Sequence, residues 1–326
     1  MRRFSLSMVV GGRELTLFVA CLAVAAIFAA ASPYFATVDN LATVMRNSVE
    51  LLVIGLGMTL ILAMGGIDVS VGMVMGIAAI VVGTLLQAGV APLWTLPAGL
   101  ATGALLGLVT ASVVVLGRIP AIVGTLGLLG VYRAAIFLLL GGTWLSGLPP
   151  TLTDLFALRV AGIPLPVLVI AATYAAAWVA LRRTPYGLHL LAIGNDEERA
   201  RLSGVAVAKV RFATFMASGL LCGLAALFYI STYRNVAMTI GGTIALEAIA
   251  AVVLGGTNIM GGRCSLLGTA LGVVLLRLLQ NGLVLIGVPS LWQTVVTGGL
   301  LLLVLSSDAL RGRLPVARRI AWRTSS

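Results

Sequence analysis

Residues 51–87 read LLVIGLGMTLILAMGGIDVSVGMVMGIAAIVVGTLLQ, two apolar runs with a single aspartate between them. The runs 51–63 and 73–86 contain no charged side chain. An α-helix needs about 20 mostly apolar residues to cross a bilayer. This stretch therefore predicts two membrane-spanning helices, joined where glycine residues precede Asp68.

The composition of the whole chain is that of a membrane protein. Its 326 residues are 60% hydrophobic and only 10% charged, whereas about 25% is usual in soluble domains. No polar segment is long enough for a second, soluble domain, so we expect a single transmembrane domain over residues 1–326. The net charge of +11 does not indicate nucleic-acid binding, because the arginines lie between apolar runs rather than on one face with aromatics. The three cysteines lack metal-ligand spacing.

The apolar pattern recurs along the chain and predicts an all-α polytopic protein with about ten transmembrane helices. Helices are expected because lipid offers no hydrogen-bond partner to backbone groups. The first apolar stretch, 15–31, follows a basic start like that of a signal peptide, but it exceeds the roughly 7–15 residues usual for one. We interpret it as a helix that is retained. The expected spans are 14–33, 46–64, 69–88, 93–116, 120–141, 163–182, 210–231, 240–256, 265–286 and 290–307.

The distribution of basic residues predicts the orientation. Ten spans place both termini, including the tail at 308–326, on one side of the membrane. Sixteen of the 21 lysines and arginines then lie on that side. Three lie on the other side (Arg46, Arg159 and Arg234), and Arg133 and Arg277 fall within spans. Because basic residues accumulate in cytoplasmic loops, both termini are expected to be cytoplasmic.

Two connecting loops are long enough to bind a partner. The outer loop, about 141–162, contains Trp144 and a Pro149–Pro150 pair. It is either an ordered cap that forms a docking surface or a tight connector held by an interfacial tryptophan. The inner loop, about 183–209, is the most polar part of the chain.

A short helix is expected within the inner loop. Asn195 or Asp196 can cap a helix that starts at Glu197 and ends at Gly204. Acidic residues in its first turn and arginines further along suit the helix dipole. Such a helix has little core of its own, so its side chains are available to a partner subunit.

Charged residues within spans need a partner or water, because a charge at bilayer depth costs about 2.5–3.5 kcal/mol even on insertion scales. Glu50, Arg133, Glu247 and Arg277 fall within predicted spans. Two acids and two bases can pair structurally or line a path for a solute, and the sequence leaves both interpretations open. Neutral groups suited to a polyhydroxylated ligand lie in the same spans: Asn47, Thr125, Tyr132, Gln280 and Asn281.

The position of Asp68 follows from the span count, which places it at the cytoplasmic joint between the second and third spans. We expect its carboxylate to cap the third helix at a solvated end, accepting from the N–H of Ser70 or Val71. A sharper hypothesis is that Asp68 also helps to form an inner gate.

Five motifs in one order resemble a known family. They are GGIDVSVG (65–72), RIPAIVGTLGLLGVYR (118–133), AIGNDEERARLSGV (192–205), EAIAAVVLGGTNIMGG (247–262) and GTALGVVLLRLLQNGLVLIGV (268–288). The set is similar to the permease subunits of bacterial ABC importers for ribose and related sugars, over nearly the whole chain. The segment from Arg118 to Pro150 looks most like the C-type autoinducer-2 import permeases.

The resemblance implies one half of an importer with the ribose/vitamin B12-like fold, located in the bacterial inner membrane. A second permease, in the autoinducer-2 systems a different chain, would complete the pore. Two ATPase subunits would bind beneath it, and a periplasmic solute-binding protein would deliver the solute. The coupling signature of the family maps onto Glu198, Arg199, Ala200 and Gly204, with an arginine at 199 where the pattern has alanine. Together with the inner-loop helix, this gives the predicted coupling residues Asn195, Asp196, Glu197, Glu198, Arg199, Ala200 and Gly204. The polar residues within the spans and at the Asp68 joint give the predicted path or gate residues Asn47, Glu50, Asp68, Thr125, Tyr132, Arg133, Glu247 and Asn281.

The chain has no G-x-x-x-x-G-K-[ST] phosphate loop, and its one lysine is Lys209. We therefore expect a non-catalytic subunit that binds no metal or cofactor itself, with ATP and magnesium used by the partner ATPase. The best substrate prediction is autoinducer-2, and the alternatives are ribose, rhamnose or another monosaccharide. A proton-coupled secondary transporter that uses Glu50 and Glu247 is a remote alternative. His189, in the inner loop, is expected to be a loop residue and not a catalytic base.

Overall fold

The computed structural model describes residues 12–289, 292–293, 295–296, 298–299 and 302. Within this part of the chain, nine of the ten predicted spans contain a helix. The tenth, 290–307, lies largely outside the described residues, and the tail at 308–326 lies wholly outside them. The nine helices are α1 (Gly12–Ala31), α2 (Val38–Ala63), α3 (Val71–Gln87), α4 (Pro92–Ala111) continued by the π-helix η2 (Ser112–Leu116), α5 (Ala121–Leu140), α7 (Leu165–Arg183), α10 (Val207–Tyr233), α11 (Ile244–Leu254) and α12 (Leu266–Leu285).

Seven of these helices are long and apolar enough to cross a membrane, and α3 and α11 are the shorter exceptions. The predicted span 240–256 is thus a helix of only 11 residues, preceded by turns. Gly241 and Gly242 explain the shortening, because glycine is a poor helix former and Gly241 adopts a φ of +74°. Irregular backbone in a membrane protein is tolerated where it is buried in protein or lines a cavity.

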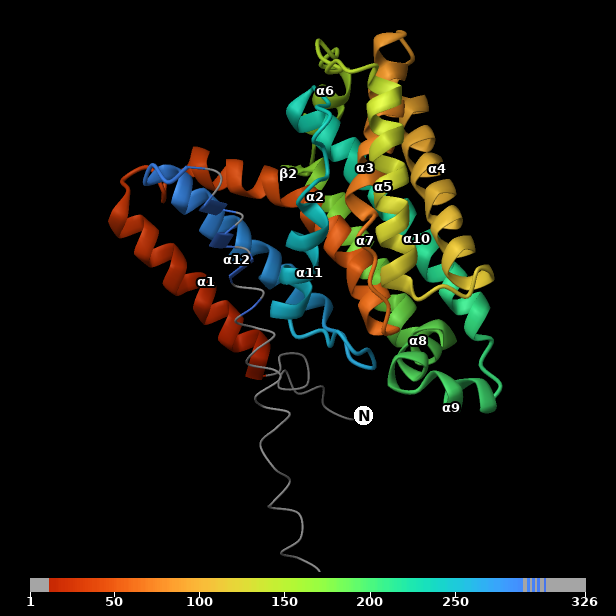
Figure 1. Cartoon of the computed structure of the whole chain (residues 1–326). Helices are drawn as coiled ribbons and strands as arrows, with labels where there is room; N and C mark the ends of the chain where they lie inside the picture. Colours follow the sequence, from red (N-terminus) through yellow and green to blue (C-terminus); the bar gives the residue numbers. More distant parts are fainter. Residues whose placement is uncertain (1–11, 290–291, 294, 297, 300–301, 303–326) are drawn as a thin grey trace, which may run out of the picture.

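The helices form two groups (Figure 1). The helices α3, α4, α5 and α10 stand beside one another, while α1 and α12 lean together away from them. The longest helix, α10, packs on α4, α2 and α3, and α2 also contacts α11 and α12. The main core lies between α2, α3, α10 and α11. The helix α2 therefore belongs to both groups.

The α4–α10 contact depends on glycines spaced four residues apart. Gly99, Gly103 and Gly107 of α4 face Gly219 and Gly223 of α10. A Cβ added to Gly103 would lie 2.2 Å from the Gly219 carbonyl oxygen. Small residues at this spacing let two membrane helices approach at backbone distance, where van der Waals packing holds them together.

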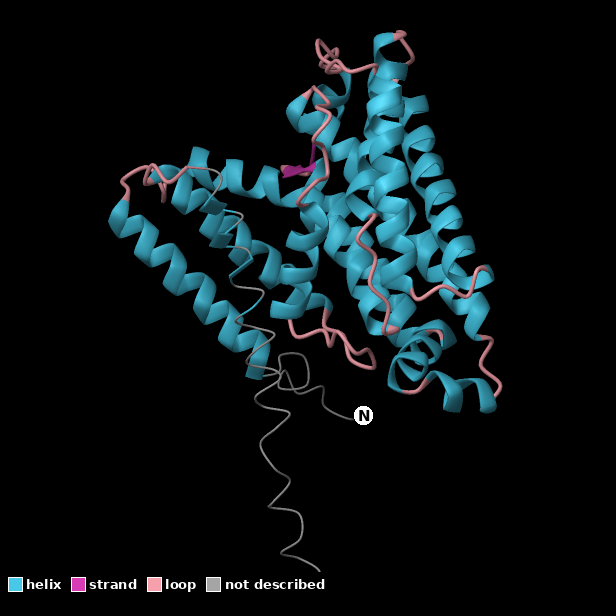
Figure 2. Cartoon of the chain, viewed as in Figure 1, coloured by secondary structure: helices cyan, strands magenta, loops and turns pink. Residues whose placement is uncertain are grey.

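The outer loop is ordered, as one of the two interpretations of the sequence predicted. It contains the helix α6 (Thr151–Ala157) and a hairpin of two short antiparallel strands, β1 (Arg159–Val160) and β2 (Ile163–Pro164), so the fold is not strictly all-α (Figure 2). Leu148 and Leu152 are buried. The Arg234 guanidinium donates to the Leu148 carbonyl at 2.7 and 3.0 Å. Trp144 is exposed and does not anchor the loop to the rest of the chain.

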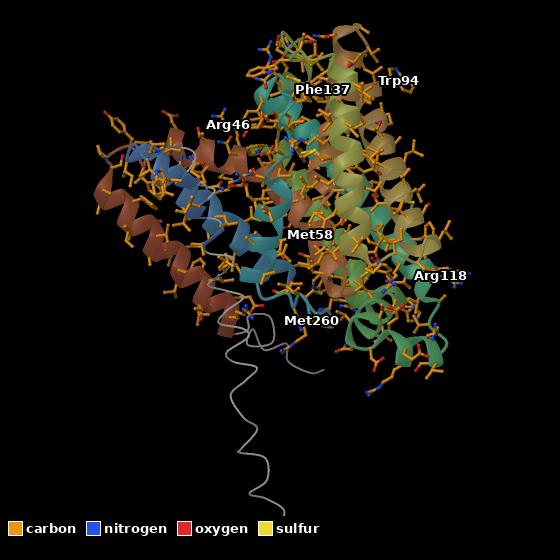
Figure 3. The ribbon with its side chains drawn as sticks, in the orientation of Figure 1. Arg46, Met58, Trp94, Arg118, Phe137 and Met260 are labelled. Atoms are coloured by element: carbon orange, nitrogen blue, oxygen red, sulfur yellow. The ribbon has the colours of Figure 1, made fainter. Side chains whose placement is uncertain are left out.

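The cap and the inner loop lie at opposite ends of the helices. Figure 1 shows α6 at one end and the inner-loop helices α8 (Pro185–Asn195) and α9 (Glu197–Leu202) at the other. Arg46, predicted to be outside, lies toward the α6 end, and Arg118, predicted to be inside, lies toward the α8–α9 end (Figure 3). The predicted alternation of loops is therefore consistent with the structure, while the direction across a membrane remains a prediction.

Candidate functional site

The inner loop folds as two helices, whereas the sequence predicted one. The second helix, α9, ends at Leu202 and not at Gly204. Gly204 takes a left-handed conformation with φ +84°, and its N–H donates to the Arg201 carbonyl at 3.0 Å. Glycine is the residue that ends helices in this way, since it has no Cβ to oppose a positive φ. Gly204 therefore lies in the turn that follows α9 and is not part of the helix.

The cap of α9 is Asp196. Its Oδ1 accepts from the Arg199 N–H at 3.0 Å, as expected for a residue that satisfies an unpaired donor in the first turn. Asn195, the other candidate, is the last residue of α8, and its side-chain amide donates to the Leu191 carbonyl at 2.9 Å. Asn195 therefore closes one helix and Asp196 opens the next.

The charged side chains of α9 form ion pairs at the surface. Glu197 pairs with Arg211 of α10 at 2.6 Å, Arg199 pairs with Asp196 at 2.9 Å, and Glu198 pairs with Arg201. Exposed pairs of this kind contribute about 0–1 kcal/mol, because water screens them. Their charges are therefore accessible to a partner at little cost to the fold.

Apolar side chains on the inward face of the α8–α9 pair pack against the rest of the chain. Ala200 is 4% exposed and belongs to a cluster with Leu190 and Ile193 of α8 and Leu60 and Ile61 of α2. This cluster gives the short helices the apolar core that they lack alone.

The backbone of α8 touches the end of α2. A Cβ added to Gly194 would lie 2.0 Å from the Ala63 carbonyl oxygen and 2.4 Å from the Gly262 nitrogen. The Gly262 N–H also donates to that Ala63 carbonyl at 2.9 Å. At the start of α8, the Tyr186 hydroxyl lies 2.9 Å from the Thr214 hydroxyl of α10, and burial raises the pKa of the Tyr186 phenol. A displacement of α8 would therefore be transmitted directly to α2 and α10.

A cavity of about 690 Å³ opens beside these helices. Its walls come from the α2–α3 joint (Gly65 and Gly66), the segment after η2 (Arg118) and the α9–α10 corner (Glu197 and Arg211). Arg118 adopts a φ of +51°, which is uncommon outside glycine. The cavity joins the inner loop to the stretch that contains Asp68.

Asp68 is not at a solvated helix end, and that prediction is wrong. The residue is 4% exposed. Its Oδ1 accepts from the Ser70 N–H at 2.8 Å, one of the two donors predicted, and from the Ser70 hydroxyl at 2.6 Å. It does not cap α3 as predicted, because the N-cap position of that helix is Ser70 itself. The joint folds inward because the Thr125 hydroxyl of α5 accepts from the Val69 N–H and donates to the Ile67 carbonyl, both at 3.3 Å. Asp68 and Thr125 therefore belong to one buried joint.

Three of the four charges predicted within spans form one cluster. Arg277 of α12 contacts Glu50 of α2 at 3.3 Å and Glu247 of α11 at 3.2 Å. It also donates to Gln280 at 2.7 Å. The side chains of all three charged residues are at most 14% exposed. Two carboxylates around one guanidinium leave an uneven balance of charge at a buried position.

The fourth charge, Arg133, does not join this cluster. Its side chain lies exposed on α5, and the described residues give it no ion pair. Of the two interpretations left open by the sequence, structural pairing is therefore found for three of the four charges, with one base serving both acids.

The other predicted path residues are scattered. The Tyr132 hydroxyl donates to the Leu106 carbonyl at 3.2 Å. Asn281 exchanges side-chain hydrogen bonds of 2.9 Å with Asn40, which ties α12 to α2. Asn47 is half-buried. These contacts hold helices together, and they do not bring the three side chains to one place.

Sequence analysis missed the segment that faces the charged cluster. A cavity of about 220 Å³ lies against Glu50, Glu247 and Arg277, and its other wall includes Tyr229 and the turn residues 239–243. The glycine pair at 241–242, just before an acidic residue in an apolar run, was the available signal.

Comparison with known proteins identifies relatives that are all named as permease components or import permeases. Residues 40–305 match the family described as "Branched-chain amino acid transport system / permease component". The ribose import permease protein RbsC of Escherichia coli K12 is 34% identical over 89% of this chain and 92% of its own length. That of Haemophilus influenzae is 31% identical over 90% and 93%. The autoinducer 2 import system permease protein LsrD of Photorhabdus laumondii is 30% identical over 85% of each chain. No solved structure matches.

Proposed function

The chain belongs to the family of permease components of branched-chain amino acid transport systems, and on that premise we propose that it is the transmembrane subunit of an ATP-driven importer for a sugar or sugar-like molecule. It is a multi-pass protein of the inner membrane, and its relatives are permease components without ATPase activity of their own. The named substrates of the relatives, ribose and autoinducer 2, favour a small polyhydroxylated solute.

The main observation that supports the proposal is the structure of the α8–α9 pair. It presents exposed charges at one end of the molecule while its backbone lies against α2. A partner ATPase that binds those charges would move α2, which contains Glu50. The proposed coupling residues are those predicted from the sequence, Asn195 to Ala200 and Gly204.

Alternating access follows if the two ends of the pore open in turn, each state being favoured by a different partner. The α6 cap, at the end opposite α8–α9, is the proposed contact of a periplasmic solute-binding protein. The path or gate is proposed to include the buried joint of Asp68 and Thr125 and the cluster around Arg277. A second permease subunit completes the pore.

Reversal of charge on α9 tests the coupling. The double variant Glu197→Lys/Glu198→Lys should lose copurification of the ATPase subunit or should hydrolyse ATP without uptake. Asp154→Lys, at an exposed position of α6 at the opposite end, is the control for copurification alone and should retain the ATPase. Normal assembly and normal uptake in the double variant would refute α9 as the contact.

The substrate is tested by uptake of labelled ribose, autoinducer-2 and rhamnose into vesicles that contain the assembled importer. The predicted resemblance to C-type autoinducer-2 permeases favours autoinducer-2, whereas the 34% identity to a ribose permease favours ribose equally. A clear rate preference among the three identifies the substrate.

A further inference from the structure

Glu50, Glu247 and Arg277 line the cavity of about 220 Å³, and two polar atoms of this cluster have no partner among the described residues. Glu50 Oε2 and Arg277 Nε are buried, and neither has a hydrogen-bond partner among the described residues. Buried polar atoms in native proteins are almost always paired, so each exception calls for an explanation. Here one orphan is an acceptor and the other is a donor.

We propose that this cavity is a solute subsite that binds the hydroxyl groups of a neutral polyol through Glu50, Glu247 and Arg277. A hydroxyl group donates one hydrogen bond and accepts others. Adjacent hydroxyls on a sugar can therefore donate to the carboxylates and accept from the guanidinium of the residues that line the cavity. The inference rests on the proposed function, and it adds where in the chain the solute is recognised and by which groups.

The charges of the cluster favour a neutral ligand over an ion. The two carboxylates repel an anion, while the Arg277 guanidinium, at 3.2–3.3 Å from both, already occupies the position between them that a compact cation would need. Hydrogen bonds to charged groups are about twice as strong as those between neutral groups. A neutral polyol gains such bonds without adding a buried charge.

The remaining wall of the cavity suits the same ligand. Tyr229 lines it and packs on Tyr233, with ring centroids 4.7 Å apart. The backbone of residues 239–243 is not helical and adds polar groups. Because a water molecule occupies about 30 Å³, the volume of about 220 Å³ accommodates several waters or one small polyol in their place.

The glycine at 241 makes this arrangement possible. A Cβ there would lie 2.1 Å from the Gly72 carbonyl oxygen of α3, and its φ of +74° is unfavourable for other residues. The loop therefore approaches α3 at backbone distance. It ends at Thr243, the residue before α11, whose hydroxyl donates to the Glu247 carboxylate at 3.1 Å. Unwound backbone beside a short helix is a known way of building solute sites in membrane proteins.

The decisive experiment compares two neutralised carboxylates on α2 in the assembled importer, with labelled ribose and autoinducer-2 as probes. Glu50→Gln keeps the shape of the side chain but removes the negative charge of a residue that lines the cavity. Asp39→Asn makes the same change at an exposed position of the same helix. We expect Glu50→Gln to lower the maximal uptake rate about tenfold, the loss expected for one hydrogen bond to a charged group, while ATP hydrolysis continues. Asp39→Asn should transport normally.

If Glu50→Gln does not assemble, a second measurement tests the proposed subsite. Thr243→Cys, in a chain whose Cys21, Cys222 and Cys264 are replaced by alanine, places one thiol in the cavity. We expect ribose or autoinducer-2, whichever the unaltered importer transports, to slow modification of this thiol by a small methanethiosulfonate reagent. An equal concentration of sodium sulfate should not.

The outcomes separate the two proposals. Uptake by the unaltered importer, together with normal uptake in Glu50→Gln, or with no protection of the thiol, would overturn the subsite and leave the importer function standing. Absence of ATP-dependent uptake of every probe by the unaltered importer would overturn the function on which the subsite rests.

Discussion

The α8–α9 pair and the Arg277 cluster both contain opposite charges, yet they are built in opposite ways. The pairs on α9 are largely exposed, and the side chain of Arg199 is 85% exposed. In the cluster, the side chain of Arg277 is 14% exposed and meets two carboxylates. Water screens the first set, whereas protein surrounds the second.

This difference separates a surface for a partner from a site for a solute. Exposed charges cost the fold little, so they are available for a second protein. Buried charges carry a desolvation penalty that their mutual attraction barely offsets, and a hydrophobic replacement would often be as stable. Their presence within an apolar chain therefore favours a functional role.

The largest expected effect is in the cluster. Arg277→Leu leaves Glu50 and Glu247 buried without a cation, which should destabilise the chain by about 3–5 kcal/mol. The measurement is the abundance of the chain in the membrane and its melting temperature in detergent. Replacement of all three residues by leucine should recover the stability but not the uptake. A single variant as stable as the unaltered chain would show that the cluster is not effectively buried.

The next effect concerns the connection between the two regions. Gly194→Val drives a side chain into the Ala63 carbonyl, and overpacking of this kind costs about 1–3 kcal/mol. We expect assembly with the ATPase to survive while uptake falls, since α8 no longer lies against α2. Gly127→Val on α5 is the control, because a Cβ there meets nothing within 4 Å. Equal uptake in both variants would contradict transmission through this contact.

A smaller effect is expected from the cap of α9. Asp196→Ala removes the acceptor of the Arg199 N–H and should destabilise the helix by about 1 kcal/mol. Hydrogen exchange at the amides of α9 should accelerate accordingly. Asp196→Asn retains a capping oxygen and should exchange more slowly than the alanine variant. Unchanged exchange in Asp196→Ala would mean that packing of Ala200 alone holds α9.

The smallest effect is expected from an exposed ion pair. Arg199→Gln should change the stability by less than about 1 kcal/mol, because water screens the pair with Asp196. Its melting temperature should lie close to that of the unaltered chain. A loss of stability comparable with that of Arg277→Leu would erase the contrast between the two regions.

The fold was largely predictable because lipid imposes a simple rule on the sequence. Apolar runs of sufficient length predicted nine helices that the structure contains, and Asp196 was one of two residues predicted to cap α9. Turn chemistry was harder to predict, as Gly204 shows. Gly204 was predicted to be the last residue of the helix, but α9 ends at Leu202 and Gly204 lies in the turn that follows.

The site was predicted less well because local sequence patterns do not predict which residues far apart in the chain come into contact. Glu50, Glu247 and Arg277 were each identified as charges within spans, but their meeting depends on how α2, α11 and α12 pack. Asp68 was expected in water because its position in the chain lies between helices. In the structure that joint is buried and packs against Thr125. Hydrophobic periodicity in the sequence does not predict this contact.

The central claim is that this chain is a pore-forming subunit driven by a separate ATPase, and reconstituted uptake tests it most directly. The chain and its partner permease are placed in vesicles with or without the ATPase subunits, with ATP, the binding protein and labelled ribose or autoinducer-2. We predict uptake only when the ATPase and ATP are both present, and no effect of a proton uncoupler. Uptake without the ATPase, or uptake that stops with the uncoupler while ATP remains, would contradict the claim.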